Sequence, residues 1–246
     1  MVADRRTLAR LSWALVVLVV ISAAVTLLLT SGVLHTQFDI PDLVDRLVAI
    51  RTDDEAVFPL VIVGSLATLG VYLIAALLGV VLRAWAPAST TRDAMSILLV
   101  FGGLIGIGSQ LMNIGVGDAA RPFYCECGYR AEQMIGRDEA LNLGWSMVNW
   151  MAMGAVTFVG FGVAMAARVV TVTPAWRILS YAVVVGVLLA VALRFLASLV
   201  FIEAFDPYQI SDLIVAFTTG ILVPIWALLL ARGIQEPGGQ PVAAAV

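Results

Sequence analysis

Six long apolar runs constrain this chain more than any other feature of its sequence. They cover approximately residues 11–34, 57–83, 95–115, 140–167, 176–202 and 210–231. A helix needs about 20 residues to cross a hydrocarbon core of about 30 Å at 1.5 Å per residue, and each run reaches that length. Only 13% of the residues are charged, against about 25% in soluble domains. We therefore predict an all-α polytopic membrane protein, a six-transmembrane-helix bundle.

Little of the chain lies outside these runs, so we expect a single transmembrane domain over residues 1–234. The first run is too long for the 7–15-residue apolar core of a cleaved signal peptide, and we interpret it as a retained helix. The tail at 235–246 contains Pro237-Gly238-Gly239 and a run of alanines. We expect this tail to be disordered.

The distribution of arginine predicts the orientation. All 14 basic residues are arginine, and cytoplasmic loops of membrane proteins are enriched in basic residues. With the N-terminus inside, eight arginines fall on the cytoplasmic side and five in outer loops, while 14 of the 17 acidic residues fall outside. We predict that both termini are cytoplasmic and that the protein is a multi-pass protein of the cell membrane, the inner membrane of a prokaryote.

The first outer loop contains a short helical pattern. Residues 39–48, DIPDLVDRLV, place a proline where the first turn of a helix accepts it and space apolar residues four apart. We expect a short amphipathic helix on the outer surface. It could serve as a lid on the bundle or as a contact for a partner or for lipid.

Local signals also indicate where two helices begin. Thr90, with Asp93 three residues later, is typical of a capping box before the third run. Thr173 followed by Pro174 is typical of a helix N-cap with proline at the first helical position. Both positions lie in short inner turns.

Small residues and one proline predict how the helices pack. Small residues four apart let helix backbones approach closely in lipid, and Gly102 with Gly106 forms such a pair in the third run. The fourth run has its own set, Gly160, Gly162 and Ala166. We predict a close contact between these two helices. Pro224 lies inside the sixth run and should kink it, freeing a backbone carbonyl.

Arg194 is the strongest candidate for a binding residue, because an ionisable residue inside a membrane helix marks a functional site by default. Asn149, Gln110 and Asn113 fall in the outer halves of their helices. These residues predict an outward-facing polar pocket in which Arg194 holds an anionic or carbonyl-bearing ligand. In the alternative, Arg194 reaches outward and pairs with Glu203 or another acidic residue of the outer loops.

Both cysteines, Cys125 and Cys127, lie in one outer loop. A disulfide is chemically allowed on the oxidising side of the membrane, and a bridge across one residue is strained, which favours a higher reduction potential. The alternatives are free thiols, intermolecular pairing, redox activity, or a metal site completed by His35, the single histidine. Two thiolates and one imidazole are a marginal ligand set, so we predict no metal.

Several classes of function lack their required residues. Without lysine the chain cannot form a retinal Schiff base, and with one histidine it cannot ligate haem through two histidines. It has no H-E-x-x-H, G-x-S-x-G or P-loop motif. We expect no cofactor, no catalytic residues and no nucleic-acid partner.

The layout resembles uncharacterised prokaryotic six-helix membrane proteins of a domain-of-unknown-function family. The resemblance rests on an arginine-led first helix, a short helix before the second run, and the inner turn TPAWRIL at residues 173–179. It implies the six-helix fold and carries over no catalytic residues, and the cysteine loop is not part of it.

The interpretation that we favour is a non-enzymatic membrane protein with an outward-facing polar pocket, acting as a binding or accessory subunit. Its partners would be membrane lipid and either further copies of itself or a larger membrane complex. One alternative is a small transporter or oligomeric channel. Its moving or selecting parts would be Pro224, the glycines of the third run and Arg194. Another is a thiol redox protein that uses Cys125 and Cys127.

Overall fold

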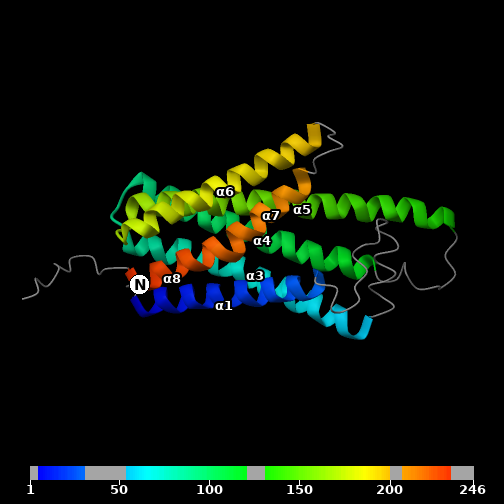
Figure 1. Cartoon of the computed structure of the whole chain (residues 1–246), viewed down its shortest axis with the longest axis horizontal. Coiled ribbons are helices and arrows are strands. Elements are labelled where there is room, and N and C mark those ends of the chain that lie inside the picture. The colour runs from blue at the N-terminus through cyan, green and yellow to red at the C-terminus, as the bar shows by residue number, and fades with distance from the viewer. Residues whose placement is uncertain (1–4, 31–53, 121–130, 200–206, 234–246) are drawn as a thin grey trace, which may run out of the picture.

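The computed structural model describes residues 5–30, 54–120, 131–199 and 207–233, and these form six helical spans (Figure 1). The first five are α1 (Arg5–Thr30), α3 (Asp54–Trp85), α4 (Thr90–Ala120), α5 (Ala131–Val169) and α6 (Pro174–Leu199). The last span has three parts, α7 (Pro207–Phe217), the π-helix η2 (Thr218–Leu222) and α8 (Val223–Gly233). All six are long and apolar enough to cross a membrane, which confirms the predicted helical class and number of spans. The helix expected at 39–48 and the tail at 235–246 lie outside the described residues.

The spans are arranged as a ring in chain order. Each packs against the next one along the sequence, and α8 closes the ring by packing against α1. Consecutive spans run in opposite directions, so the start of α1 and the end of α8 lie at the same end of the bundle (Figure 1). Short connections at 86–89 and 170–173 produce this up-and-down order.

The two ends of the bundle differ in charge. The end where α1 begins, here called the arginine end, carries one acidic residue, Asp93, among the described residues, and eight arginines: Arg5, Arg6, Arg10, Arg83, Arg92, Arg168, Arg177 and Arg232. The opposite end, here called the acidic end, carries Asp54, Glu55, Asp118, Glu132, Arg137, Asp138 and Glu139. At this end α5 extends furthest (Figure 1), because residues 131–142 precede its apolar span of Leu143–Val169.

The main hydrophobic core lies inside the ring of helices, in the half of the bundle nearest the arginine end. Its fully buried side chains come from all parts of the ring and include Leu8, Leu82, Met95, Trp176 and Leu230. Trp176 of α6 stacks on Trp226 of α8 with ring centroids 5.5 Å apart, and the indole Nε1–H of Trp226 donates to Ser180 Oγ at 2.9 Å. Apolar side chains therefore fill the interior at this level.

The starts of α4 and α6 show how local sequence sets the turns. Thr173 caps α6 as predicted, because its Oγ1 accepts a hydrogen bond from the Trp176 backbone N–H at 3.3 Å. At α4 the predicted capping residue was one position off. Ser89 is the cap and accepts from the Arg92 backbone N–H at 3.2 Å, while Asp93 instead forms ion pairs with Arg83 and Arg92.

Glycine allows the predicted close contact between α4 and α5. A Cβ at Gly102 would lie 2.9 Å from the Ala155 carbonyl oxygen of α5, and one at Gly162 would lie 2.6 Å from the Leu99 side chain of α4. Gly106, however, faces α3, where a Cβ would overlap the ring of Tyr72. The paired glycines of α4 therefore serve two different neighbours, because α4 lies between α3 and α5 in the ring.

The helix before Pro224 is distorted, and the distortion takes the form of a π-helical turn. A proline in a helix has no N–H and its ring collides with the carbonyl four residues earlier. The turn before Pro224 widens into the π-helix η2, and the Val223 N–H bonds to the Thr218 carbonyl five residues back. This distortion separates α7 from α8.

Candidate functional site

Arg194 lies near the end of α6, three residues before its apolar span ends at Ala197. This is about 4.5 Å of helix rise, so Arg194 is closer to the membrane interface than we expected from an apolar run ending at 202. The residue is 9% exposed. A charge with so little access to water needs a polar partner inside the protein.

Asp212 of α7 is one such partner. Arg194 Nη1 donates to Asp212 Oδ1 at 2.5 Å, and the side chain of Arg194 is 11% exposed whereas that of Asp212 is 62% exposed. Beside the pair, Ser211 Oγ donates to the Ala190 carbonyl at 2.9 Å. The ion pair and this hydrogen bond join α6 to α7 at the acidic end.

The structure does not bring the other residues predicted to line a polar pocket together around Arg194. Asn149 lies on α5 and is exposed on the outside of the bundle, although the neighbouring Trp150 packs against Phe195 of α6 with centroids 5.2 Å apart. Gln110 and Asn113 are half-buried on α4, which α5 separates from α6 in the ring. Binding of a ligand by these residues stays a prediction.

Three predicted site residues cannot be placed. Glu203, Cys125 and Cys127 lie outside the described residues, as does His35. Within the described ranges, no group of three His, Cys, Asp or Glu side chains is placed to hold a metal ion.

Hydroxyl side chains connect neighbouring helices at two points. Ser22 of α1 and Thr68 of α3 share a hydrogen bond of 2.8 Å, and Ser109 Oγ of α4 donates to the Val148 carbonyl of α5 at 3.1 Å. In lipid such bonds join helices because the alternative is an unsatisfied polar group in hydrocarbon. The hydroxyl groups of Ser22, Thr68 and Ser109 therefore hold neighbouring helices together.

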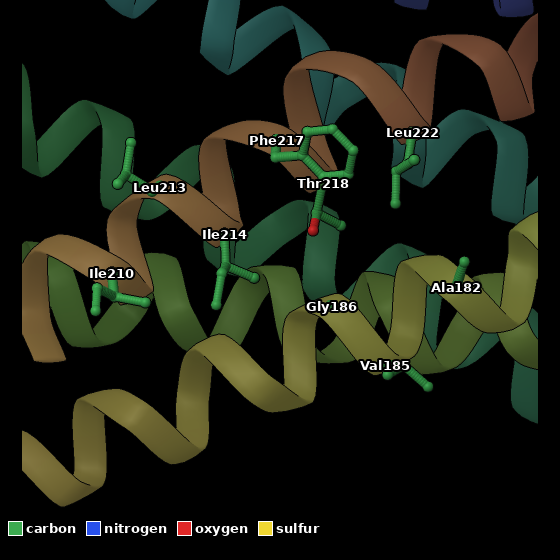
Figure 2. Close-up of a pocket in the computed structure, with 9 residues that line it drawn as sticks. All are labelled: Ala182, Val185, Gly186, Ile210, Leu213, Ile214, Phe217, Thr218 and Leu222. Carbon is green, nitrogen blue, oxygen red and sulfur yellow. The ribbon is translucent and has the colours of Figure 1, made fainter.

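An apolar groove runs along the outside of the bundle between α6 and the α7–η2 segment (Figure 2). It has a volume of about 410 Å³ and is open on one side. The residues that line it are Ala182, Val185 and Gly186 of α6 and Ile210, Leu213, Ile214, Phe217, Thr218 and Leu222 of the last span. Figure 2 shows Ile214, Thr218 and Leu222 extending from the last span toward α6. Apart from the Thr218 hydroxyl, the side chains that line the groove are apolar.

Sequence reasoning missed both Asp212 as the partner of Arg194 and the groove. Asp212 had a detectable signal, because it is an ionisable residue two positions inside the span that begins at Ile210, and such residues pair with one another. The groove had no such signal, since it depends on which faces of two distant segments meet.

Comparison with models of protein families, with curated proteins and with solved structures finds no match to this chain. Any functional conclusion therefore rests on the residues and geometry described above.

Proposed function

We propose that this protein is a non-enzymatic integral membrane protein that acts as a binding or accessory subunit of a membrane complex. It spans the membrane of a prokaryotic cell with the arginine end in the cytoplasm, because basic residues accumulate in cytoplasmic loops. The charge difference between the two ends supports this orientation.

The observation that carries the proposal is the packing of side chains in the half of the bundle nearest the arginine end. A transporter or channel needs polar groups or a water-filled path at membrane depth. Here the interior at that level is occupied by the stacked pair Trp176 and Trp226 together with Leu8, Leu82 and Met95. Ser12, Ser96 and Ser180 are the buried serines at this level, and an interior filled mostly by apolar side chains favours binding over conduction.

The outside of the ring offers surface for a partner. Its largest exposed apolar side chains include Leu27, Ile97, Ile178 and Leu213, which are 66–71% exposed. In a membrane such side chains face either lipid or another helix, and neighbouring helices associate through close packing. An accessory subunit would use part of this surface.

The proposal is tested by extracting the tagged full-length protein from its own host in a mild detergent and measuring the mass of the particle. We expect a defined assembly larger than the 26.1 kDa chain, with a second protein or further copies in fixed ratio. In proteoliposomes the purified chain should not increase the flux of ions or small anions. A monodisperse single chain, or a flux abolished by Arg194→Gln, would contradict the proposal.

A transporter is the second candidate, and one specific observation favours it. The last span has a π-helix next to Pro224 and an ion pair at its outer end, and π-helical turns are frequent at functional sites. The flux measurement distinguishes this candidate from the first. The third candidate, thiol redox activity of Cys125 and Cys127, concerns residues outside the described ranges.

A further inference from the structure

The two halves of the last span are held in the bundle to different degrees. α8 packs on both α1 and α6, whereas α7 packs mainly on α6. Followed from α8 to α7, the span leaves α1 and approaches α6 toward the acidic end (Figure 1). Among residues 210–217 of α7, Ser211 is the one buried side chain, whereas α8 buries Pro224, Trp226, Ala227 and Leu230. A segment with few buried side chains opens at a lower free energy than the core does, so α7 is the more easily displaced half.

The segment η2 supplies a hinge between these halves. The Val223 N–H bonds to the Thr218 carbonyl five residues back, and Pro224 has no N–H to donate. A Cβ at Gly220 would meet nothing within 4 Å, so this turn has room to change its shape. Sharp bends of helices occur at proline and at π-helical turns, and in hinge motions a few residues at the end of an element absorb the change. The last span can therefore bend here while α7 and α8 each stay helical.

A close contact with α6 fixes the point about which α7 turns. Thr218 begins η2 and is 1% exposed. It lies so close to Gly186 that a Cβ at that position would collide with Thr218 Oγ1. The apolar groove is open beside this contact. One of its walls is formed by α7, through Ile210, Leu213, Ile214 and Phe217 (Figure 2). A turn of α7 about Thr218 therefore changes the width of the groove.

Two polar contacts hold the outer end of α7 on α6. Arg194 donates to the Asp212 carboxylate, and Ser211 Oγ donates to the Ala190 carbonyl at 2.9 Å. The Asp212 side chain is 62% exposed, so water competes with Arg194 for its carboxylate, and exposed ion pairs are weak. Contacts of this strength break and re-form without loss of the fold.

We propose that α7 is a hinged arm that turns about η2 while α8 stays in place. The ion pair between Arg194 and Asp212 is the latch that holds the outer end of the arm on α6. Release of this latch moves α7 away from α6 and widens the apolar groove. The device goes beyond the proposed function and needs no protein partner, so it is tested on the purified chain alone.

The movement is tested by pulsed electron paramagnetic resonance on the full-length chain in lipid nanodiscs. Both native cysteines are replaced by serine, and spin labels are attached to cysteines introduced at exposed positions. The arm pair is Leu196 of α6 with Leu213 of α7, and the reference pair is Ile178 of α6 with Ile225 of α8. We expect a second, longer distance for the arm pair as a minor population, and one narrow distance for the reference pair. A single narrow distance for the arm pair in every variant below would overturn the proposal.

Asp212→Ala tests the latch. It should raise the ratio of released to latched arm at least about tenfold, the factor that corresponds to the loss of one partly buried ion pair. Asp93→Ala is the matched control, because it removes a carboxylate that pairs with Arg83 and Arg92 at the opposite end of the bundle and should leave the arm pair unchanged. Helix content measured by circular dichroism should stay the same in both variants.

Three results would refute the latch: an unchanged ratio in Asp212→Ala, an equal change in the control, or a loss of helix, which would mean that α7 unfolds rather than turns. Asp212→Asn keeps an oxygen that accepts from Arg194 and should produce a smaller shift in the same direction. It replaces the alanine variant in the test if that variant does not fold.

Gly220→Ala tests the position of the hinge, in the protein that already carries Asp212→Ala. Alanine stiffens a helical turn relative to glycine, so the ratio of released to latched arm should fall about fourfold. Gly154→Ala in the same protein is the control, because a Cβ there also meets nothing within 4 Å but lies on α5, away from the arm. An unchanged ratio in Gly220→Ala, or an equal fall in the control, would overturn the assignment of the hinge to η2.

Discussion

Removing the carboxylate of Asp212 should destabilise the protein more than removing the charge of Arg194. Asp212→Ala removes the α7 carboxylate that forms an ion pair with a guanidinium only 9% exposed. Arg194→Gln leaves a carboxylate that is 62% exposed and close to the interface, where water solvates it. Loss of Asp212 should therefore lower the free energy of unfolding more than loss of the Arg194 charge does.

The size of the effect follows from exposure. Two unit charges about 4 Å apart attract by about 1 kcal/mol in water and about 4 kcal/mol at an effective dielectric constant of 20. Breaking a fully buried pair costs about 3–5 kcal/mol, and an exposed pair contributes at most about 1 kcal/mol. With one buried and one exposed partner, we expect Asp212→Ala to lower the free energy of unfolding by about 2 kcal/mol, and Arg194→Gln by about half of that.

The measurement is reversible unfolding of the purified protein in mixed micelles for four proteins, the wild type, Asp212→Ala, Arg194→Gln and the double variant Arg194→Met with Asp212→Leu. The double variant should recover most of the lost stability, because apolar residues of similar volume often replace an ion pair at no cost. A neutral effect of Asp212→Ala, or a larger effect of Arg194→Gln, would refute the reasoning. Either result would mean that Arg194 does not depend on α7 for its charge balance.

Two further pairs of substitutions test the packing and the turns. Gly106→Ala places a methyl group against the ring of Tyr72 and should destabilise the bundle by about 1–3 kcal/mol. Gly154→Ala is its control, because nothing lies within 4 Å of a Cβ there and the higher helix propensity of alanine should make it neutral or slightly stabilising. Thr173→Ala removes the oxygen that accepts from the Trp176 N–H and should lower stability by about 1 kcal/mol, whereas Thr173→Ser should retain it. Thermal unfolding measures both pairs, and equal melting of the two glycine variants, or of the two threonine variants, would contradict the assigned contacts.

The N-cap of α4 shows where prediction from local sequence loses accuracy. Ser89, Thr90 and Thr91 all have side chains that accept the same hydrogen bond, and the sequence offered no reason to choose the first. The predicted capping box also used Asp93 at the helix start. In the structure Asp93 pairs with Arg83, ten residues earlier on the preceding helix, so a contact between helices decided a local detail.

Arg194 shows the same limit at the candidate site. Its position in an apolar run marks it from sequence, since a charge there needs a partner. Which carboxylate supplies that partner depends on how α6 and α7 are rotated against each other, and Asp212 is 18 residues away along the chain. The expected partner Glu203 lies in the connection between those helices, outside the described residues.

The sequence by itself determined that the chain forms six membrane-spanning helices, where α6 begins, and that the last span is interrupted near Pro224. Each of these follows from chemistry within a few residues: apolar length against the thickness of a bilayer, a side-chain oxygen at a helix start, and a missing N–H. Only the tertiary structure decided that Gly106 faces Tyr72, that Arg194 pairs with Asp212, and that an apolar groove lies beside Gly186. These depend on which faces of different helices meet, and nearly every face of an apolar helix in this chain has the same composition.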